Sequence, residues 1–229
     1  MSKRRPVANT SSESRRFLRD NGLSLALLAL FVVSLGGQLV AGHRAFNDEE
    51  HEHGQPSVRL SEYVGGAHFW EAVAENWESE FLQMGAYIWL TAFLFQRGSA
   101  ESHDPDGNEP KRPPPNPRDI PWGARQRGFI RKVYERSLSL AFAGLFLFSF
   151  ALHAVTGAAH YSNEQLAHGG NAVTMWQYLG TSQFWFESFQ NWQSEFLAIL
   201  SMVVLTIFLR QDGSAESKEV DRPHGETGR

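Results

Sequence analysis

The sequence contains no cysteine, which excludes disulfide bonds, thiol catalysis and metal sites built on thiolates. Neither sign of charge dominates, because 21 basic and 25 acidic side chains leave a formal net charge of only -4. This balance gives no electrostatic reason to expect a nucleic acid as partner. The sequence also lacks a Ser-His-Asp arrangement, a phosphate-binding loop and a dinucleotide fingerprint, so we expect a protein that is not an enzyme.

Charge is also absent from two long apolar blocks, residues 23–42 and 138–157. A helix of about 20 residues crosses a hydrocarbon core of roughly 30 Å, so each block is predicted to span a membrane. Two shorter apolar blocks each follow an aromatic segment that can extend the helix, which predicts further spans at about 77–96 and 192–210. The sequence therefore predicts an all-α integral membrane protein with four transmembrane helices.

Residues 16–102 and 131–217 are two copies of one unit. Aligned without gaps at a shift of 115 residues, the copies are identical at 34 of 87 positions. Each copy is predicted to be a hairpin of two spanning helices, with an amphipathic aromatic helix at the membrane interface before the second span. Because each hairpin crosses twice, the two copies share one orientation, as parallel repeats do.

Lysine and arginine are almost missing from the two loops inside the hairpins. Nineteen of the 21 basic residues lie in the N-terminal tail, in residues 97–136 or in residues 210–229, and only Arg44 and Arg59 lie in a hairpin loop. The positive-inside rule therefore predicts that both termini and the linker are cytoplasmic. A linker rich in proline and charge is typical of a flexible tether. The predicted parts are an N-terminal tail at 1–19, a first hairpin at 20–102, the linker at 103–130, a second hairpin at 131–217 and a C-terminal tail at 218–229.

Two motifs recur in both copies. Asn-Trp-x-Ser-Glu-Phe-Leu stands at 76–82 and 191–197, and Gly-Ser-Ala-Glu-Ser stands at 98–102 and 213–217. With the opening Phe-Leu-Arg-Asp-Asn-Gly-Leu-Ser at 17–24, these motifs resemble an uncharacterised family of bacterial four-helix membrane proteins, a domain of unknown function. The resemblance covers nearly the whole chain outside the tails and linker. It implies a multi-pass protein of the bacterial inner (plasma) membrane and carries over no catalytic residue.

The first candidate site is a pair of glutamates in the repeated Asn-Trp-x-Ser-Glu-Phe-Leu motif, Glu80 and Glu195. Asn76 and Asn191 lie four residues earlier, so each shares a helix face with its glutamate. An acid at mid-membrane costs on the order of 3 kcal/mol and normally faces a bundle interior or water. Two interpretations stay open: a paired-carboxylate site for a proton, cation or small solute, or interfacial acids that hydrogen-bond their own helix ends.

Further polar candidates lie in the apolar blocks and in the loops. Gln38 and His153 occupy equivalent positions, where we expect hydrogen bonds that join helices. A haem would need two facing histidines, and the apolar blocks contain only His153, so we expect no cofactor. Loop histidines beside acids suit zinc or another divalent ion, although their spacing matches no specific metal site. The metal candidates are His51, His53, His160 and His168.

These observations predict a multi-pass protein of the lipid bilayer with a structural or partner-binding role. A homodimer is one form that such a partner could take. The alternative is a small transporter or channel that uses the Glu80 and Glu195 pair. A cavity containing both carboxylates would favour the transporter, and carboxylates at the lipid boundary would favour the structural role.

Overall fold

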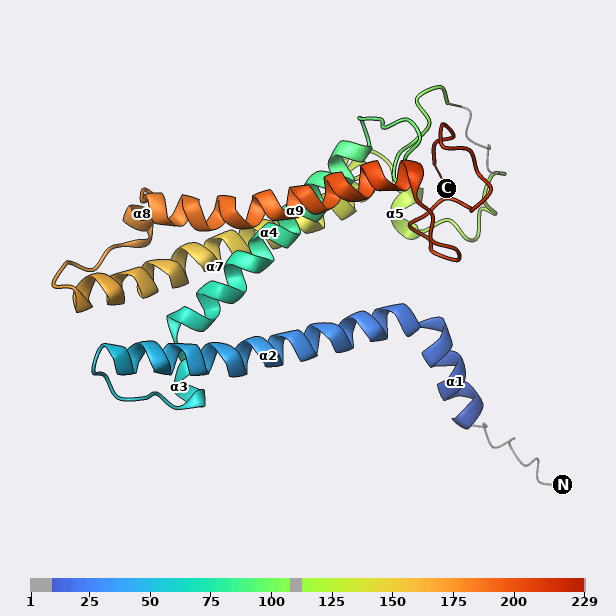
Figure 1. Ribbon diagram of the computed structural model, residues 1–229. Helices are drawn as coiled ribbons and strands as arrows, with labels where there is room; N and C mark the ends of the chain where they lie inside the picture. The colour runs from blue at the N-terminus through green and yellow to red at the C-terminus, as the bar shows by residue number, and fades with distance from the viewer. Residues whose placement is uncertain (1–9, 108–112, 229) are drawn as a thin grey trace. The chain divides into compact units, whose positions relative to one another are not determined.

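The computed structural model describes residues 10–107 and 113–228, and all regular secondary structure in these ranges is helical (Figure 1). The chain forms two compact units, residues 1–69 and 70–229, and the boundary falls inside helix α4. The first unit contains α1 (Thr10–Asp20), α2 (Gly22–Glu52), α3 (Leu60–Gly65) and the first residues of α4 (Ala67–Thr91). The second contains the rest of α4 with α5 (Trp122–Arg125), α6 (Phe129–Glu135), α7 (Ser137–Ala167), α8 (Met175–Tyr178) and α9 (Ser182–Phe208).

The two hairpins are built by the same local rules. Helices α2 and α7 begin and end at positions that are 115 residues apart. The loop after each helix is fixed in the same way: the main-chain N–H of Val58 donates to the Asn47 side chain at 2.7 Å, and that of Val173 donates to Ser162 at 2.9 Å. The loop conformation therefore follows from residues at matching positions in the two copies.

The core of the second unit lies where α7, α8 and the start of α9 meet. Ala154, Ala158, Tyr178 and Phe184 form a buried cluster there. Gly157 permits this packing, because a Cβ atom at that position would lie 2.5 Å from Cε1 of Tyr178. Burial of an aromatic side chain of this size contributes roughly 1.5–3 kcal/mol, so the cluster anchors the loop end of the hairpin, where α7 turns into α8.

Helix α4 packs against both α7 and α9. Gly85 brings α4 close to α7, since a Cβ atom there would lie 3.3 Å from Cβ of Phe142. The Gln83 side chain donates to the main-chain oxygen of Glu195 on α9 at 2.9 Å. These contacts hold one face of α4 toward the space between α7 and α9.

By length and composition, the described residues contain three candidate membrane spans rather than the predicted four. Three helices are long and apolar enough to cross a membrane, namely α2, α7 and α9. The predicted span at 77–96 lies in α4, which ends at Thr91. Phe93, Leu94 and Phe95 follow the helix as exposed residues, and the preceding turns of α4 carry several acids, so α4 lacks a sufficiently long apolar stretch.

The sequence predicted an interfacial helix for each aromatic segment, but neither segment forms a separate helix. Residues 69–81 lie inside α4, and residues 184–196 lie inside α9. Neither segment contains glycine or proline, so no residue interrupts the helical hydrogen bonding. Both long helices therefore run directly from the aromatic segment into the apolar block.

The repeated Gly-Ser-Ala-Glu-Ser motif forms the turn after each second helix. The main-chain N–H of Gln96 donates to the Ser102 hydroxyl at 2.8 Å, and that of Gln211 donates to Ser217 at 2.9 Å. Each turn uses a left-handed glycine, with φ of 84° at the first motif and 76° at the second. The C-terminal tail packs on the first turn through Lys218, whose ammonium is buried and donates to the main-chain oxygens of Gly98, Pro223, His224 and Glu226.

Candidate metal centre

Helix α4 presents three acids on the face that it turns toward α7 and α9. Glu71, Glu75 and Glu78 are spaced by four and three residues, which places them on one side of a helix. Glu71 and Glu78 are buried, and Glu75 is half-buried. An acidic face so poorly exposed requires polar or cationic partners from the neighbouring helices.

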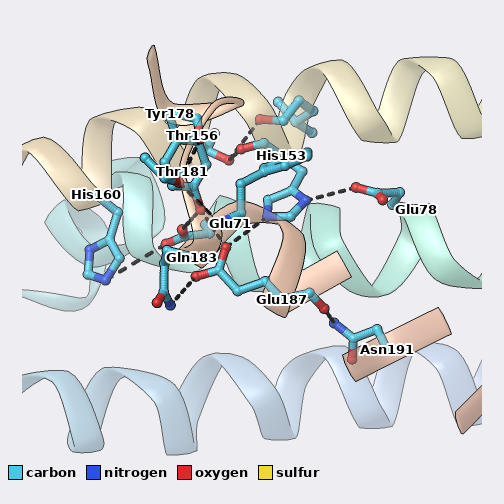
Figure 2. A network of polar contacts seen from close by, with 12 residues as sticks. Glu71, Glu78, His153, Thr156, His160, Tyr178, Thr181, Gln183, Glu187 and Asn191 are labelled. Atoms are coloured by element: carbon cyan, nitrogen blue, oxygen red, sulfur yellow. Dashed lines mark hydrogen bonds and ion pairs between the residues drawn. The ribbon is translucent and has the colours of Figure 1, made fainter. Parts of the chain in front are cut away.

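His153 of α7 is the central partner, and its imidazole lies between two carboxylates (Figure 2). Nδ1 lies 2.8 Å from Oε2 of Glu78, and Nε2 lies 3.3 Å from Oε2 of Glu187 on α9. The side chains of His153 and Glu78 are both 0% exposed. Three helices thus contribute one charged or titratable group each to a single buried contact.

Glu78 is held at both of its oxygens. Oε2 contacts His153, and Oε1 accepts a hydrogen bond of 3.0 Å from the indole N–H of Trp192. A carboxylate fixed in this way holds the ring of His153 in one orientation and favours a proton on Nδ1. Nε2 then remains as the nitrogen that faces Glu187 and can bind a ligand.

Glu187 is positioned by two donors besides the histidine. The Gln183 amide donates to Oε1 at 2.7 Å, and the Tyr178 hydroxyl donates to Oε2. Burial raises the pKa of Tyr178 above its ordinary value, and its hydrogen bond to Glu187 adds to the increase. The Tyr178 hydroxyl therefore stays protonated near neutral pH and acts as a donor to the carboxylate.

Glu75, His153 and Glu187 together form a group that fits a metal ion. One ligand atom from each lies within 4.8 Å of the other two. Metal bonds of about 2.0–2.2 Å place neighbouring ligand atoms roughly 3–4 Å apart, so only a small inward movement of these side chains closes the site. The Asn191 side chain hydrogen-bonds the Glu75 carboxylate and helps to hold it at the site.

Acids outnumber basic side chains around this group. Four carboxylates, those of Glu71, Glu75, Glu78 and Glu187, surround one buried histidine, and in the described part of the chain none of them is paired with lysine or arginine. A buried charge without compensation costs several kcal/mol. Protons on some of these carboxylates, or an added cation, would supply the missing compensation.

The structure places the six predicted polar residues in different surroundings. His153 lies at the centre of the cluster, and Asn191 contacts Glu75 and donates to the Glu187 main-chain oxygen at 3.2 Å. Glu80 and Asn76 are exposed on α4, and Glu195 is half-buried on α9. Gln38 is half-buried in the first unit.

The four loop histidines have other local roles. His53 and His168 each approach a main-chain oxygen of their own helix, at 3.0 and 2.8 Å, next to the left-handed glycine that ends the helix. His51 hydrogen-bonds Ser57 at 2.6 Å, and His160 lies 3.8 Å from Glu71. The group of Glu75, His153 and Glu187 therefore includes none of these four histidines.

Glu71, Glu75, Glu78 and Glu187 were missed from the sequence because they are not repeated. Their counterparts in the other copy are Phe186, Gln190, Gln193 and Ala72. A signal for them did exist: three acids at helical spacing precede an apolar block, and an apolar block elsewhere contains a lone histidine. Spacing alone did not show that these two features meet.

The comparison with known families matches residues 14–229 to a family described as "Domain of unknown function (DUF6766)". The chain belongs to this family. Membership in the DUF6766 family agrees with the resemblance drawn from the repeated motifs, and it assigns no activity or ligand to the cluster. No curated protein and no solved structure matches the chain.

Proposed function

We propose that this DUF6766 protein is a multi-pass membrane protein without enzymatic activity that binds a divalent transition-metal ion between α4, α7 and α9. One observation carries the proposal: Glu75, His153 and Glu187 offer three ligand atoms within 4.8 Å of one another. Each ligand comes from a different helix, so a bound ion would tie the three helices together. This role keeps the structural function expected from the sequence and assigns it a site.

The surroundings of His153 support a metal more strongly than a simple ion pair. A metal-binding histidine usually donates its second ring N–H to a carboxylate, which fixes the ring and raises its basicity. Glu78 occupies this position at 2.8 Å from Nδ1, and Trp192 in turn fixes Glu78. His153 would thus bind the metal, while Glu78 orients His153 and Trp192 holds Glu78 in place.

The donor types select the class of metal. Calcium and magnesium prefer oxygen donors alone, whereas imidazole nitrogen together with carboxylate oxygen suits zinc, manganese or ferrous iron. Two carboxylates would also neutralise the charge of a divalent ion. A first-row divalent transition metal is therefore the expected ligand class.

The proposal includes four membrane crossings, with α4 as the fourth. The buried acids of α4 face α7 and α9, so they add little contact between charge and lipid. The concentration of basic residues in the tails and the linker supports a cytoplasmic position for both termini. The bacterial inner membrane is the location that we propose.

The test is titration of the purified, detergent-solubilised protein with Co²⁺, followed by calorimetry and by visible absorption. We expect one ion per chain. The substitutions Glu75→Gln, His153→Gln and Glu187→Ala each install the residue that the other copy carries at the matching position. Each should weaken binding by more than about 100-fold, because loss of a ligand exceeds the 10–100-fold effect of a supporting residue.

Glu80→Gln is the matched control, because it removes an acid from the same helix at an exposed position. It should leave the Co²⁺ affinity unchanged. The proposal fails if the wild-type protein binds none of Co²⁺, Zn²⁺ and Mn²⁺. It also fails if the control weakens binding as much as Glu75→Gln does, since binding would then reflect overall charge.

A further inference from the structure

A row of polar side chains leads from the loop end of α7 toward the proposed metal site. His153, His160 and Glu164 are spaced by seven and four residues, so they lie on one face of this helix. The exposed fraction of the side chain falls along the row, from 49% at Glu164 to 23% at His160 and 10% at Glu71 of α4. The row therefore joins solvent to the buried cluster.

The members of this row are within reach of one another. Nε2 of His160 lies 3.8 Å from Oε2 of Glu71 (Figure 2). The same nitrogen lies 3.4 Å from Oε1 of Glu164. The other Glu71 oxygen lies 3.4 Å from the Tyr178 hydroxyl oxygen, and this hydroxyl donates its proton to Glu187. A cation held by His160, Glu164 and Glu71 would therefore be close to the proposed ligand Glu187.

Aromatic rings surround the site on the side toward the linker. The His153 ring stacks on Phe184 with centroids 4.8 Å apart, and Phe150 packs edge-on against Phe184 at 5.3 Å. Phe146, one turn further along α7, contacts both Phe150 and Trp192. These rings supply no carboxylate or imidazole ligand, so a hydrated cation has no binding group among them.

We propose that His160, Glu164 and Glu71 form a capture subsite through which a divalent metal ion reaches the buried site from the loop end only. This inference rests on the proposed metal site and adds its route and direction of loading. Two acids and an imidazole attract the ion and replace part of its hydration shell. The chain then takes up metal on one side and holds it, without conducting it across.

The first test measures the rates of Co²⁺ binding by stopped-flow quenching of tryptophan fluorescence, since Trp192 contacts Glu78 in the site. His160→Ala installs the residue found at the matching position of the other copy, Ala45. Both association and dissociation should slow by about tenfold, a typical size for loss of electrostatic guidance, while the dissociation constant stays unchanged. His168→Ala is the control, because that histidine caps its own helix end.

The outcomes separate the two proposals. If Co²⁺ binds the wild-type protein but His160→Ala leaves both rates unchanged, the capture subsite is wrong and the metal site stands. If His160→Ala weakens the affinity as strongly as His153→Gln does, His160 is a ligand and the route is also wrong. Absence of any Co²⁺ binding at equilibrium overturns both.

The second test addresses direction, with the Asn171→Cys variant in proteoliposomes. An impermeant maleimide measures the fraction of molecules whose α7–α8 loop faces outward. Co²⁺ added outside should quickly quench the tryptophan fluorescence of that fraction. The fluorescence of the oppositely oriented molecules should be quenched slowly. Rapid quenching of all molecules, with the vesicles shown to be tight, would mean that the ion crosses the protein, which overturns one-sided access and favours a transporter.

Discussion

At the scale of single residues, the imidazole of His153 is held from both sides. Both ring nitrogens face carboxylates, and the whole side chain is buried. Glu78 and Glu187 nevertheless have different surroundings. Glu78 is fully buried and accepts from an indole N–H, whereas Glu187 is partly exposed and accepts from Tyr178 and Gln183. We therefore assign orientation of the ring to Glu78 and metal ligation to Glu187.

This assignment predicts the behaviour of Glu78→Gln, which installs the residue of the matching position, Gln193. The amide oxygen can still accept from Nδ1, but the negative charge that strengthens this contact is lost. Co²⁺ affinity should fall by about 10–100-fold, as is typical for a supporting carboxylate. Calorimetry measures the affinity, and the visible spectrum of bound Co²⁺ should keep its band positions because the ligands are unchanged. An unaltered affinity would contradict the orienting role.

The sequence predicted only part of this site, for a physical reason. The repeat pointed to Glu80 and to His53 and His168, but these two histidines cap helix ends. Residues that preserve the fold must be kept in both copies, because both copies have the same loops and turns. A single metal site needs its ligands only once. Glu75 and Glu187, which differ between the copies, therefore could not be found through the repeat.

At the scale of secondary-structure elements, the contact between α7 and α8 depends on a missing side chain. Gly157 lies against the ring of Tyr178, whose hydroxyl donates to Glu187. The first copy has the same pair, and a Cβ atom on Gly42 would lie 2.4 Å from the Tyr63 hydroxyl oxygen. The two glycines set how closely each short helix approaches the long helix before it.

We predict that Gly157→Ala destabilises the protein by about 1–3 kcal/mol, the usual cost of overpacking a rigid contact. Gly144→Ala in the same helix is the matched control. Nothing lies within 4 Å of a Cβ atom there, and alanine favours a helix over glycine by about 1 kcal/mol. Thermal unfolding in detergent should show a lower midpoint for the first variant and an equal or higher one for the second. Equal midpoints would contradict the close packing.

Helix existence was predictable from apolar blocks, but helix length was not. The blocks at 23–42 and 138–157 lie inside helices of 31 residues each. Polar residues continue both helices until the His-Gly pairs end them, and hydropathy gives no weight to such caps. Helix α4 instead ends before its apolar block does, at Thr91.

At the scale of the whole molecule, the role of α4 decides the topology. Three helices qualify as spans by length and composition, which would put the two ends of the chain on opposite sides of a membrane. With α4 as a fourth span, both ends lie on the same side. The buried acids of α4 favour the second arrangement, because their partners come from α7 and α9.

Single-cysteine labelling can separate these topologies, because the natural chain contains no cysteine to remove. We predict that Gln55→Cys and Asp104→Cys, which flank α4, react with an impermeant maleimide from opposite sides of the membrane. Asn171→Cys should match Gln55→Cys, and Glu219→Cys should match Asp104→Cys. Labelling of positions 55 and 104 from the same side would show that α4 does not cross.

The burial of Lys218 has a consequence for chemical labelling. The residue is 1% exposed, and its ammonium donates to the main-chain oxygens of Gly98, Pro223, His224 and Glu226, whereas Lys132 is exposed. Acylating reagents modify an amine only when solvent reaches it. Lys218 should therefore be acylated far more slowly than Lys132, at a rate set by how often the C-terminal tail lifts from the turn at Gly98. Mass spectrometry of this one lysine would therefore report how often the contact between the C-terminal tail and the first repeat opens.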